Sequence, residues 1–154
     1  MPDANPLLRV CSLLNQEHAH YFIIGGQACI LHGLVRSTEV VDILIEPSED
    51  NCRKVLAALS QLADHAAAEL TPKDLVENVV VKIADEVEVD VSTHAWKVNY
   101  ADAFPSALSV EIQGVKIPYL GLECLIASKT TYREVDQVDV ARLRILPQIL
   151  PPKK

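Results

Sequence analysis

The hydrophobic positions in the first half of the chain alternate between helical spacing and short unbroken runs. Apolar residues recur at near-helical spacing behind Asn5 and Pro6, a pair typical of a helix start. One apolar run stops at Gly25-Gly26 and another at Glu46-Pro47, so both predict buried strands. The expected elements are a helix at 5–17, a strand at 21–24, a short helix at 27–32, a strand at 40–45, and a helix at 48–63 capped by Ser48.

The second half of the chain predicts two hairpins followed by a helical segment. Valine-rich runs flank Ala84-Asp85-Glu86, and a two-residue Gln113-Gly114 turn joins the second pair of strands. The expected elements are strands at 79–83, 87–91, 110–112 and 115–117, a helical segment at 121–146 ending before Pro147, and a frayed tail at 147–154. This order predicts an α+β fold, one domain over residues 1–154, in which a mixed sheet packs against helices.

Composition and charge narrow the class of protein. The 154 residues are 49% hydrophobic and 23% charged, which excludes a disordered or collagen-like chain. A net charge of −7 argues against broad adhesion to nucleic acid or to an anionic membrane, because both need a basic surface. A phosphate ligand held locally through metal ions stays compatible with this charge.

The cysteines and the N-terminal residues indicate a reduced compartment. The four cysteines form no C-x-x-C pair, so a zinc ribbon or a redox dithiol is not expected. The N-terminus lacks the basic and apolar regions of a secretory signal, and no apolar run reaches the ~20 residues of a membrane span. We therefore expect a cytoplasmic protein without a membrane partner.

Two positions in the first half could carry chemistry. Gly25-Gly26 lies between a strand and a helix, where glycines allow a tight turn and the helix amides can face an anion. An ordinary strand-to-helix turn has the same pattern. Asp42 interrupts an apolar strand, where an ionised carboxylate is costly unless it is paired or bound to metal. A solvent-facing edge position is the alternative.

A third group of carboxylates lies in the first predicted hairpin. Glu86, Glu88 and Asp90 alternate with valines, so the three carboxylates share one face of a strand. The solvated face of a hairpin produces the same alternation. The spacing alone does not single out Asp90.

Together these segments resemble the nucleotidyltransferase superfamily, and more closely the small bacterial proteins grouped with minimal nucleotidyltransferases and AbiEii-type toxins. That superfamily has a Gly-Gly or Gly-Ser turn, an acidic-hydrophobic-acidic triplet, and a third acidic residue on a later strand. The resemblance covers about residues 20–146. The matching segments are Ile24-Gly25-Gly26, Arg36-Ser37-Thr38-Glu39, Val40-Val41-Asp42-Ile43, Val87-Glu88-Val89-Asp90-Val91, the hairpin ending at Ile117-Pro118, and residues 122–129 followed by Arg133 and Asp136.

The resemblance implies a reaction and a set of residues. A nucleoside monophosphate would pass from a nucleoside triphosphate to a hydroxyl of a protein, RNA or small acceptor. Asp42 and Asp90 would hold Mg²⁺ or Mn²⁺, and Lys129 would neutralise charge that develops during transfer. The residues that would contact the nucleotide are Gly25, Gly26, Gln27, Arg36 and Arg133.

One departure from the family pattern weakens this hypothesis. Val40 stands where the first carboxylate of the triplet is expected. Glu39 cannot replace that carboxylate, because neighbouring residues of a strand point to opposite faces. The alternative is a catalytically degenerate protein that binds nucleotide weakly or binds a partner, as one half of a toxin–antitoxin or other defence system.

Lys129 lies on the apolar stripe of the C-terminal helical segment, next to Leu125 and Ile126 in the helical period. A lysine there either extends its ammonium to solvent or faces a cleft with an anionic partner. The resemblance favours a cleft in which Lys129 faces Asp42, Asp90 or a phosphate. We therefore expect Lys129→Ala to lower nucleotide affinity and to spare the fold.

Overall fold

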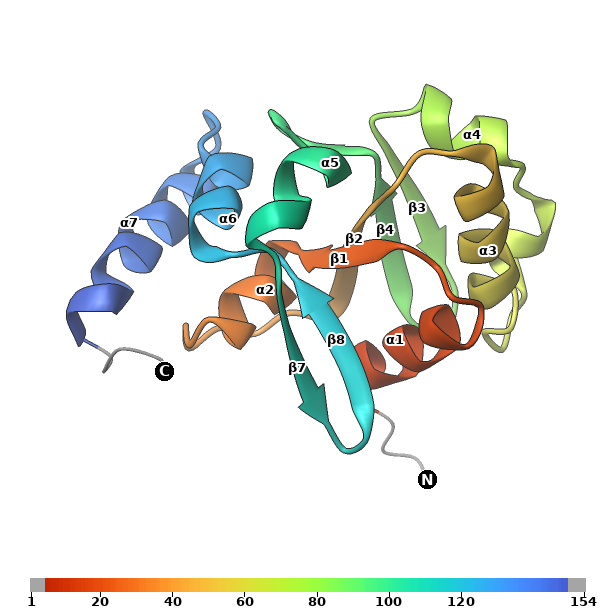
Figure 1. Ribbon diagram of the computed structural model, residues 1–154, viewed down its shortest axis with the longest axis horizontal. Coiled ribbons are helices and arrows are strands. Elements are labelled where there is room, and N and C mark those ends of the chain that lie inside the picture. The colour runs from red at the N-terminus through yellow and green to blue at the C-terminus, as the bar shows by residue number, and fades with distance from the viewer. Residues whose placement is uncertain (1–4, 150–154) are drawn as a thin grey trace.

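The computed structural model describes residues 5–149, with side chains described as far as residue 146, as a mixed sheet flanked by helices (Figure 1). The six strands of this sheet lie in the order β3-β4-β2-β1-β8-β7. They are β1 (Tyr21–Ile24), β2 (Val40–Ile45), β3 (Val80–Ala84), β4 (Glu88–Ser92), β7 (Leu108–Ile112) and β8 (Val115–Tyr119). The β2–β4 and β1–β8 pairs are parallel and the other three pairs are antiparallel, so the sheet is mixed as predicted.

Helices lie at both ends of the sheet and over its middle (Figure 1). Figure 1 shows α6 and α7 at one end of the molecule, with α3 and α4 at the other. The helices are α1 (Pro6–Gln16), α2 (Gly25–Leu31), α3 (Glu49–Leu59), α4 (Pro72–Glu77), α5 (Tyr100–Ala103), α6 (Leu122–Lys129) and α7 (Glu134–Ile149), with short 3₁₀ turns at Ala66–Glu69 and Phe104–Ser106. No helix in the described part of the chain is both long enough and apolar enough to cross a membrane.

Side-chain caps fix where several helices begin. The Asn5 side chain accepts a hydrogen bond from the amide of Leu7, and Ser48 accepts one from the amide of Asn51. Both caps satisfy amides that have no partner inside the helix. The α4 and α5 helices, which the hydrophobic pattern did not predict, each begin with a reciprocal capping box.

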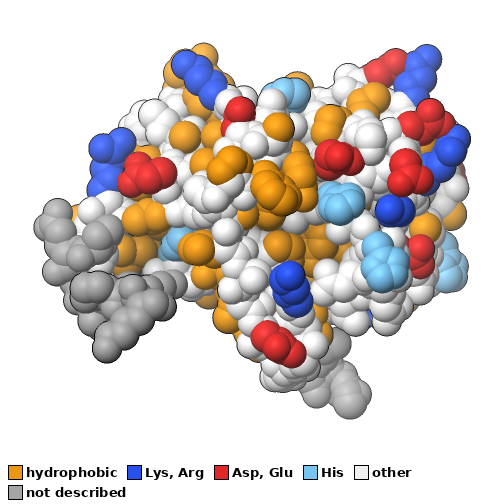
Figure 2. Space-filling model, viewed as in Figure 1, with side chains coloured by type: hydrophobic (Ala, Val, Ile, Leu, Met, Phe, Trp, Pro, Cys, Tyr) orange, Lys and Arg blue, Asp and Glu red, His pale blue; other side chains and the backbone are white. Residues whose placement is uncertain are grey.

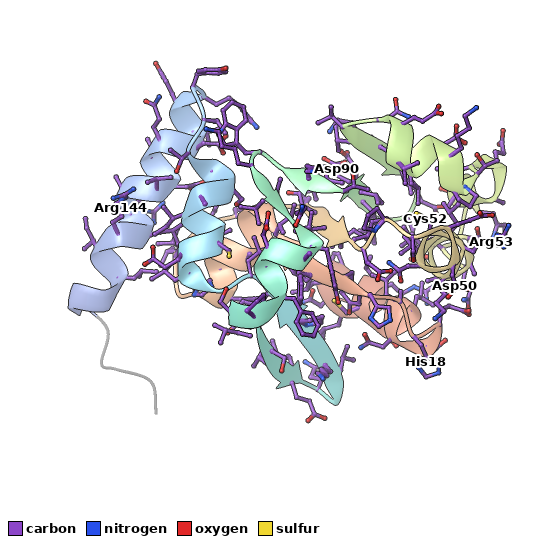
Figure 3. All side chains as sticks on the ribbon, turned by 45° about the horizontal axis from the view of Figure 1, so that its top comes forward. His18, Asp50, Cys52, Arg53, Asp90 and Arg144 are labelled. Carbon is purple, nitrogen blue, oxygen red and sulfur yellow. The ribbon has the colours of Figure 1, made fainter. Side chains whose placement is uncertain are left out.

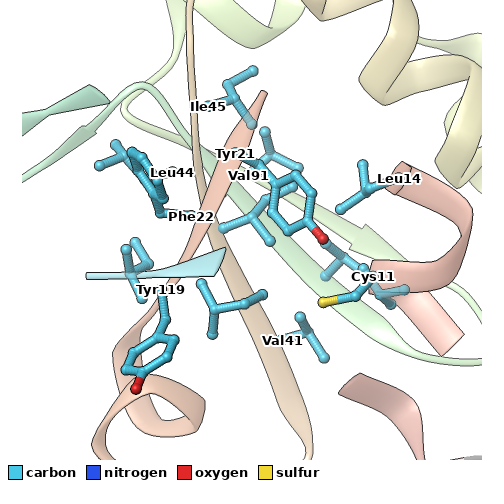
Figure 4. Close-up of a cluster of buried hydrophobic side chains, with 14 of the residues drawn as sticks. Cys11, Leu14, Tyr21, Phe22, Val41, Leu44, Ile45, Val91 and Tyr119 are labelled. Carbon is cyan, nitrogen blue, oxygen red and sulfur yellow. The ribbon is translucent and has the colours of Figure 1, made fainter. Parts of the chain in front are cut away.

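One face of strands β2 and β4 packs into the core against α1 (Figure 4). Val41 and Ile43 of β2 and Val89 and Val91 of β4 are fully buried. Figure 4 shows Val41 and Val91 in a cluster with side chains of α1, including Cys11 and Leu14. Because side chains alternate along a strand, the residues between these valines and isoleucines face the opposite side of the sheet. That opposite face carries Asp42 and Asp90.

The opposite side of the molecule also exposes apolar groups. In Figure 2 hydrophobic side chains gather over α5 in the middle of this face, and charged side chains lie toward its rim. Phe22 of β1 stacks on Tyr100 of α5 with ring centroids 4.6 Å apart. Phe104, which follows α5, is 63% exposed.

Some predicted boundaries near the N-terminal half are wrong. The helix expected at 27–32 instead begins at Gly25, directly after β1, and ends at Leu31. The helix expected to reach residue 63 ends at Leu59 and continues only as turns. In the first hairpin both strands lie one residue later than predicted, so the turn falls at 85–87.

The C-terminal helical segment also differs from the prediction. It is two helices, because Thr131 interrupts it: its hydroxyl accepts from the Arg133 amide and donates to Asp136 of α7. The α7 helix continues through Pro147 to Ile149. The frayed tail expected at 147–154 is therefore wrong for 147–149, and residues 150–154 lie outside the described part.

Candidate functional site

The Gly25-Gly26 turn brings the backbone against Asp42. Gly25 has a φ of +67°, which side chains other than glycine rarely adopt. A Cβ atom at Gly25 would lie 2.1 Å from the Asp42 Oδ2 atom, so any side chain would displace the carboxylate. At Gly26 a Cβ atom would lie 3.2 Å from the Cβ of Thr38 and 3.3 Å from the Arg36 Nε. The first glycine is thus required both by its conformation and by the position of Asp42.

Asp42 and Asp90 are register partners on the parallel strands β2 and β4, and their side chains face the same side of the sheet. Burial and the adjacent charge and hydrogen bond of Asp90 raise the pKa of Asp42 to about 6, although Lys129 and Lys82 oppose this shift. Two carboxylates without a cation between them disfavour double ionisation. The pair therefore holds excess negative charge near neutral pH.

Lys82 partly compensates this charge from the edge of the site. It lies opposite Asp90 on the antiparallel strand β3, and its Nζ is 3.0 Å from Asp90 Oδ2 and 3.5 Å from Glu88 Oε2. Glu88 is the register partner of Val40, so it lies beside the position where the sequence resemblance leads one to expect a first carboxylate. The Lys82 side chain is 65% exposed, which limits how strongly its charge acts through solvent.

Two observations test whether these residues fit a divalent cation. The Asp90 Oδ1 atom is buried and has no hydrogen-bond partner in the described structure. Across residues 5–149 no three Asp, Glu, His or Cys side chains are grouped so that they could hold a metal. Mg²⁺ is commonly held by one or two carboxylates, with water and phosphate oxygens completing its ligands. The pair Asp42 and Asp90 fits one such cation, and the residues present do not fit a site with three carboxylates and two metals.

Lys129 of α6 lies in a second, helical cluster of charges. Its Nζ is 3.1 Å from Asp136 Oδ1 and 3.1 Å from Asp139 Oδ2, both on α7. Arg36 donates a hydrogen bond to the same Asp139. Burial would raise the pKa of Asp136, but hydrogen bonds from Thr131 and Lys129 outweigh it and hold the pKa below its usual value. Lys129 is 7% exposed, so it does not extend to solvent.

A cleft of about 410 Å³ opens between the glycine turn and the α6–α7 connection. In Figure 3 the labelled Asp90 lies in the middle of the molecule, between the α6–α7 pair and the α3–α4 end. The cleft is lined by Ile24, Gly25, Asp42, Ala95, Trp96, Ser128, Lys129, Thr131, Tyr132, Arg133 and Asp136. It thus combines two carboxylates, two cations and two aromatic rings.

The structure gathers only part of the predicted site around this cleft. Gly25, Asp42, Lys129 and Arg133 line it, and Asp90 adjoins it through its pairing with Asp42. Gly26, Gln27 and Arg36 are not among the lining residues. Arg36 is engaged with Asp139, so the structure gives its guanidinium a partner inside the protein.

Four residues of this region were missed by sequence reasoning: Lys82, Trp96, Tyr132 and Asp139. Lys82 could have been found, because a lysine on one strand of a hairpin opposite a carboxylate is a common cross-strand pair. Asp139 follows Asp136 by three residues on a helix, which indicates a shared face. Trp96 and Tyr132 are far apart in the sequence, and no local pattern connects them.

Comparisons with known proteins give matches to structures only. No protein-family profile and no curated protein sequence matches this chain. Solved structures do match it over nearly the whole length. The fold is that of the nucleotidyltransferases.

Three of these structures show how general the likeness is. A lincosamide antibiotic adenylyltransferase, LnuA, solved with lincomycin bound, has a TM-score of 0.59 at 18% identity, covering 92% of this chain and 96% of its own. An antigenic nucleotidyltransferase-like protein from Paracoccidioides brasiliensis has a TM-score of 0.57 at 18% identity, covering 96% and 76%. A candidate nucleotidyltransferase from Thermotoga maritima has a TM-score of 0.55 at 16% identity, covering 91% and 89%. At these identities the likeness establishes the fold, and the activity needs separate evidence.

Proposed function

We propose that this protein is a nucleotidyltransferase that moves a nucleoside monophosphate from a nucleoside triphosphate to a hydroxyl acceptor. The observation that carries the proposal is the Asp42–Asp90 pair, whose charge is only partly neutralised and lies beside a cleft that also holds Lys129 and Arg133. Carboxylates and cations arranged in this way suit a ligand whose phosphates arrive with a metal ion.

Each residue has a defined part in this proposal. Asp42 and Asp90 would hold one Mg²⁺ or Mn²⁺, which would supply Lewis-acid stabilisation of the phosphate charge. Gly25 lets the Asp42 carboxylate approach the turn without a clash. Arg133, with a side chain 74% exposed and its Nη1 3.9 Å from Asp136 Oδ2, could turn toward a phosphate at the mouth of the cleft. Lys129 would contribute positive potential to the phosphates from the lining of the cleft, while Asp136 and Asp139 hold its ammonium in position.

The acceptor is proposed to be a small molecule, a protein or an RNA. LnuA is an adenylyltransferase of lincosamide antibiotics, and its structure holds the small molecule lincomycin. Its likeness to this chain supports a small hydroxyl acceptor among the three. We further propose grouping this chain with the minimal nucleotidyltransferases and AbiEii-like proteins, on the motifs around Gly25, Asp42 and Asp90.

A second candidate function rests on Val40 and Lys82. Val40 stands where the first carboxylate of the site is expected. The Lys82 ammonium contacts Glu88 and Asp90 of β4. A lysine in that place supports a degenerate protein that binds nucleotide or a partner without catalysis, as in a toxin–antitoxin or other defence system. The two candidates differ in what the carboxylates do: in the first Asp42 and Asp90 bind a divalent cation, and in the second Asp90 pairs with Lys82 and no cation binds.

Cation binding distinguishes these candidates. We expect Mn²⁺, titrated by calorimetry, to bind the wild type, and Asp90→Asn to lower its affinity by at least 10-fold because a direct ligand is lost. Asp50→Asn is the matched control, since Asp50 pairs with Lys54 on the exposed face of α3. Thermal stabilisation by each nucleoside triphosphate with Mg²⁺ then reports nucleotide binding.

The missing carboxylate offers a complementary test. Val40→Asp places a third carboxylate two residues before Asp42, on the same strand face. We expect it to destabilise the metal-free protein through repulsion, and to raise Mn²⁺ affinity about 10-fold or more. Absence of Mn²⁺ binding in both the wild type and Val40→Asp would contradict the catalytic proposal and favour the degenerate one.

A further inference from the structure

Two exposed aromatic rings face the cleft beside the proposed phosphate site. Trp96 is the only tryptophan of the chain and is 42% exposed, and Tyr132 is 84% exposed. Their ring centroids are 5.4 Å apart and the ring planes are nearly perpendicular. Aromatic residues make up only 5% of the chain, so two of them exposed in one cleft are unusual for this protein.

The two rings are positioned by segments far apart in the sequence. Trp96 is held between the two-residue strands β5 (His94–Ala95) and β6 (Val98–Asn99), with a φ of +58°. Tyr132 lies in the α6–α7 connection, next to Thr131, whose hydroxyl is 2.7 Å from Asp136 Oδ2. A bulky side chain at positive φ is strained, and the neighbouring structure must hold it there.

The rings contribute little to the protein core. The largest buried side chains are aliphatic, and neither Trp96 nor Tyr132 belongs to the buried cluster. In a T-shaped pair one ring presents its edge to the face of the other, which leaves aromatic faces open to a third planar group. Stacking on such a face is worth about 1–3 kcal/mol for a nucleobase, whatever the identity of the base.

The rest of the cleft selects the kind of planar ligand. Lys129, Arg133 and Asp42 line the same cleft as the two rings, so it offers charged groups and an aromatic surface together. A nucleotide has the matching halves, an anionic phosphate chain and a planar base. A cleft of about 410 Å³ also lies in the range of small-molecule sites.

We propose that Trp96 and Tyr132 form the binding surface for the nucleobase of the nucleoside triphosphate. This inference rests on the proposed function and adds the side of the cleft on which the base lies. Because recognition is by stacking, we expect the larger purine bases to bind more tightly than pyrimidines.

The single tryptophan provides the measurement. Fluorescence of the wild-type protein is titrated with ATP, GTP, CTP and UTP in Mg²⁺, and with inorganic triphosphate, which has the phosphates and lacks the base. We expect the nucleotides to quench Trp96, purines most strongly, and inorganic triphosphate to bind by calorimetry with little quenching.

Substitutions separate the base from the phosphates. By calorimetry, Trp96→Ala and Tyr132→Ala are expected to lower ATP affinity about 5- to 100-fold and to leave inorganic triphosphate affinity unchanged. Trp96→Phe should retain most of the ATP affinity, because it keeps a stacking face. Phe104→Ala is the control, since Phe104 is also exposed but lies outside this cleft. Thermal unfolding of each variant checks that it is folded.

The outcomes distinguish this inference from the function on which it rests. If ATP and inorganic triphosphate bind equally well and Trp96→Ala changes neither affinity, the aromatic pair does not hold the base and only this inference fails. If neither ligand binds the wild type, the proposed function fails and the inference fails with it.

Discussion

The sheet and the helical layer each carry a pair of neighbouring aspartates, and their charges are balanced differently. On α7, Asp136 and Asp139 contact the Lys129 ammonium, and Asp139 also contacts Arg36. On the sheet, Asp42 and Asp90 adjoin one another, and of the two the exposed Lys82 contacts Asp90 alone. The pKa of Asp136 is held below its usual value, whereas that of Asp42 is raised to about 6.

This difference separates a structural cluster from a candidate ligand site. The α7 cluster satisfies its own charges, so it gains nothing from an added ion and serves to hold α6 against α7. The Asp42–Asp90 pair leaves a buried oxygen without a partner and retains repulsion, so a bound cation would relieve both. The α7 aspartates therefore position Lys129, whereas the β2–β4 aspartates form the acidic site on the sheet.

The largest expected effect comes from removing the cation of the balanced cluster. Lys129→Ala would leave two aspartates with side chains only 10% and 4% exposed, and Asp139 would keep only the half-buried Arg36 as a partner. Breaking a buried ion pair in this way costs about 3–5 kcal/mol, so we expect a loss of that order in the free energy of unfolding, measured with urea. This replaces the sequence-based expectation that Lys129→Ala spares the fold.

The control for this variant is a lysine on the surface. Lys73→Ala removes an exposed pair with Glu77 on α4 and should change stability by less than about 1 kcal/mol. Equal stability losses in the two variants would show that the α7 cluster does not depend on Lys129.

The second effect concerns the unbalanced pair and has the opposite sign. Because Asp42 keeps its proton up to about pH 6 in the folded protein and loses it near pH 4 when unfolded, folding stability falls as the pH rises through that window. We expect Asp42→Asn to remove this fall and to be more stable than the wild type at pH 8 by about 2 kcal/mol. Its amide can also donate to the Asp90 carboxylate.

Urea unfolding at several pH values measures this prediction. The wild type and Asp42→Asn should agree most closely near pH 4 and diverge above it. A constant difference between them from pH 4 to pH 8 would show that Asp42 does not titrate in that range. In the metal-free protein Asp42→Asn should raise stability above pH 6. In a Mn²⁺ titration the same variant should bind more weakly, so stability and binding change in opposite directions.

The smallest effect on stability is expected at Lys82. Its side chain is 65% exposed, so Lys82→Gln should leave the free energy of unfolding nearly unchanged. Its ammonium contacts the carboxylates of Glu88 and Asp90, and a divalent cation would compete with it. We therefore expect Mn²⁺ affinity to rise about 3- to 10-fold by electrostatic relief.

Lys54→Gln is the matched control for this change, because Lys54 pairs with Asp50 on α3, away from the sheet site. NMR titration of the Asp42 carboxyl provides a second measurement. Since Lys82 lowers the pKa of Asp42, its removal should raise that pKa further. An unchanged Asp42 pKa and an unchanged Mn²⁺ affinity would show that Lys82 does not act on the pair.

Local sequence patterns were sufficient for the elements with a clear hydrophobic signal. The strands at 21–24 and 40–45 have the predicted bounds, because apolar runs ended by glycine or by proline define a buried strand locally. The short helices α4 and α5 were missed, although the capping residues Thr71 with Asp74 and Asn99 with Asp102 are local signals for them. Their hydrophobic stripes are too short to show a period.

The sequence by itself determined which residues could serve a site, namely Gly25, Asp42 and the β4 strand carrying Asp90. It could not decide between a solvated carboxylate face and a metal site. Residue spacing shows which side chains share a face of a strand, but it does not show which strand lies beside it. The parallel β2–β4 register pairs Asp42 with Asp90, and the turn at Thr131 directs Lys129 to Asp136 and Asp139. Only the tertiary structure decides such contacts, because they join residues on different elements, and helical or strand periodicity says nothing about how different elements pack together.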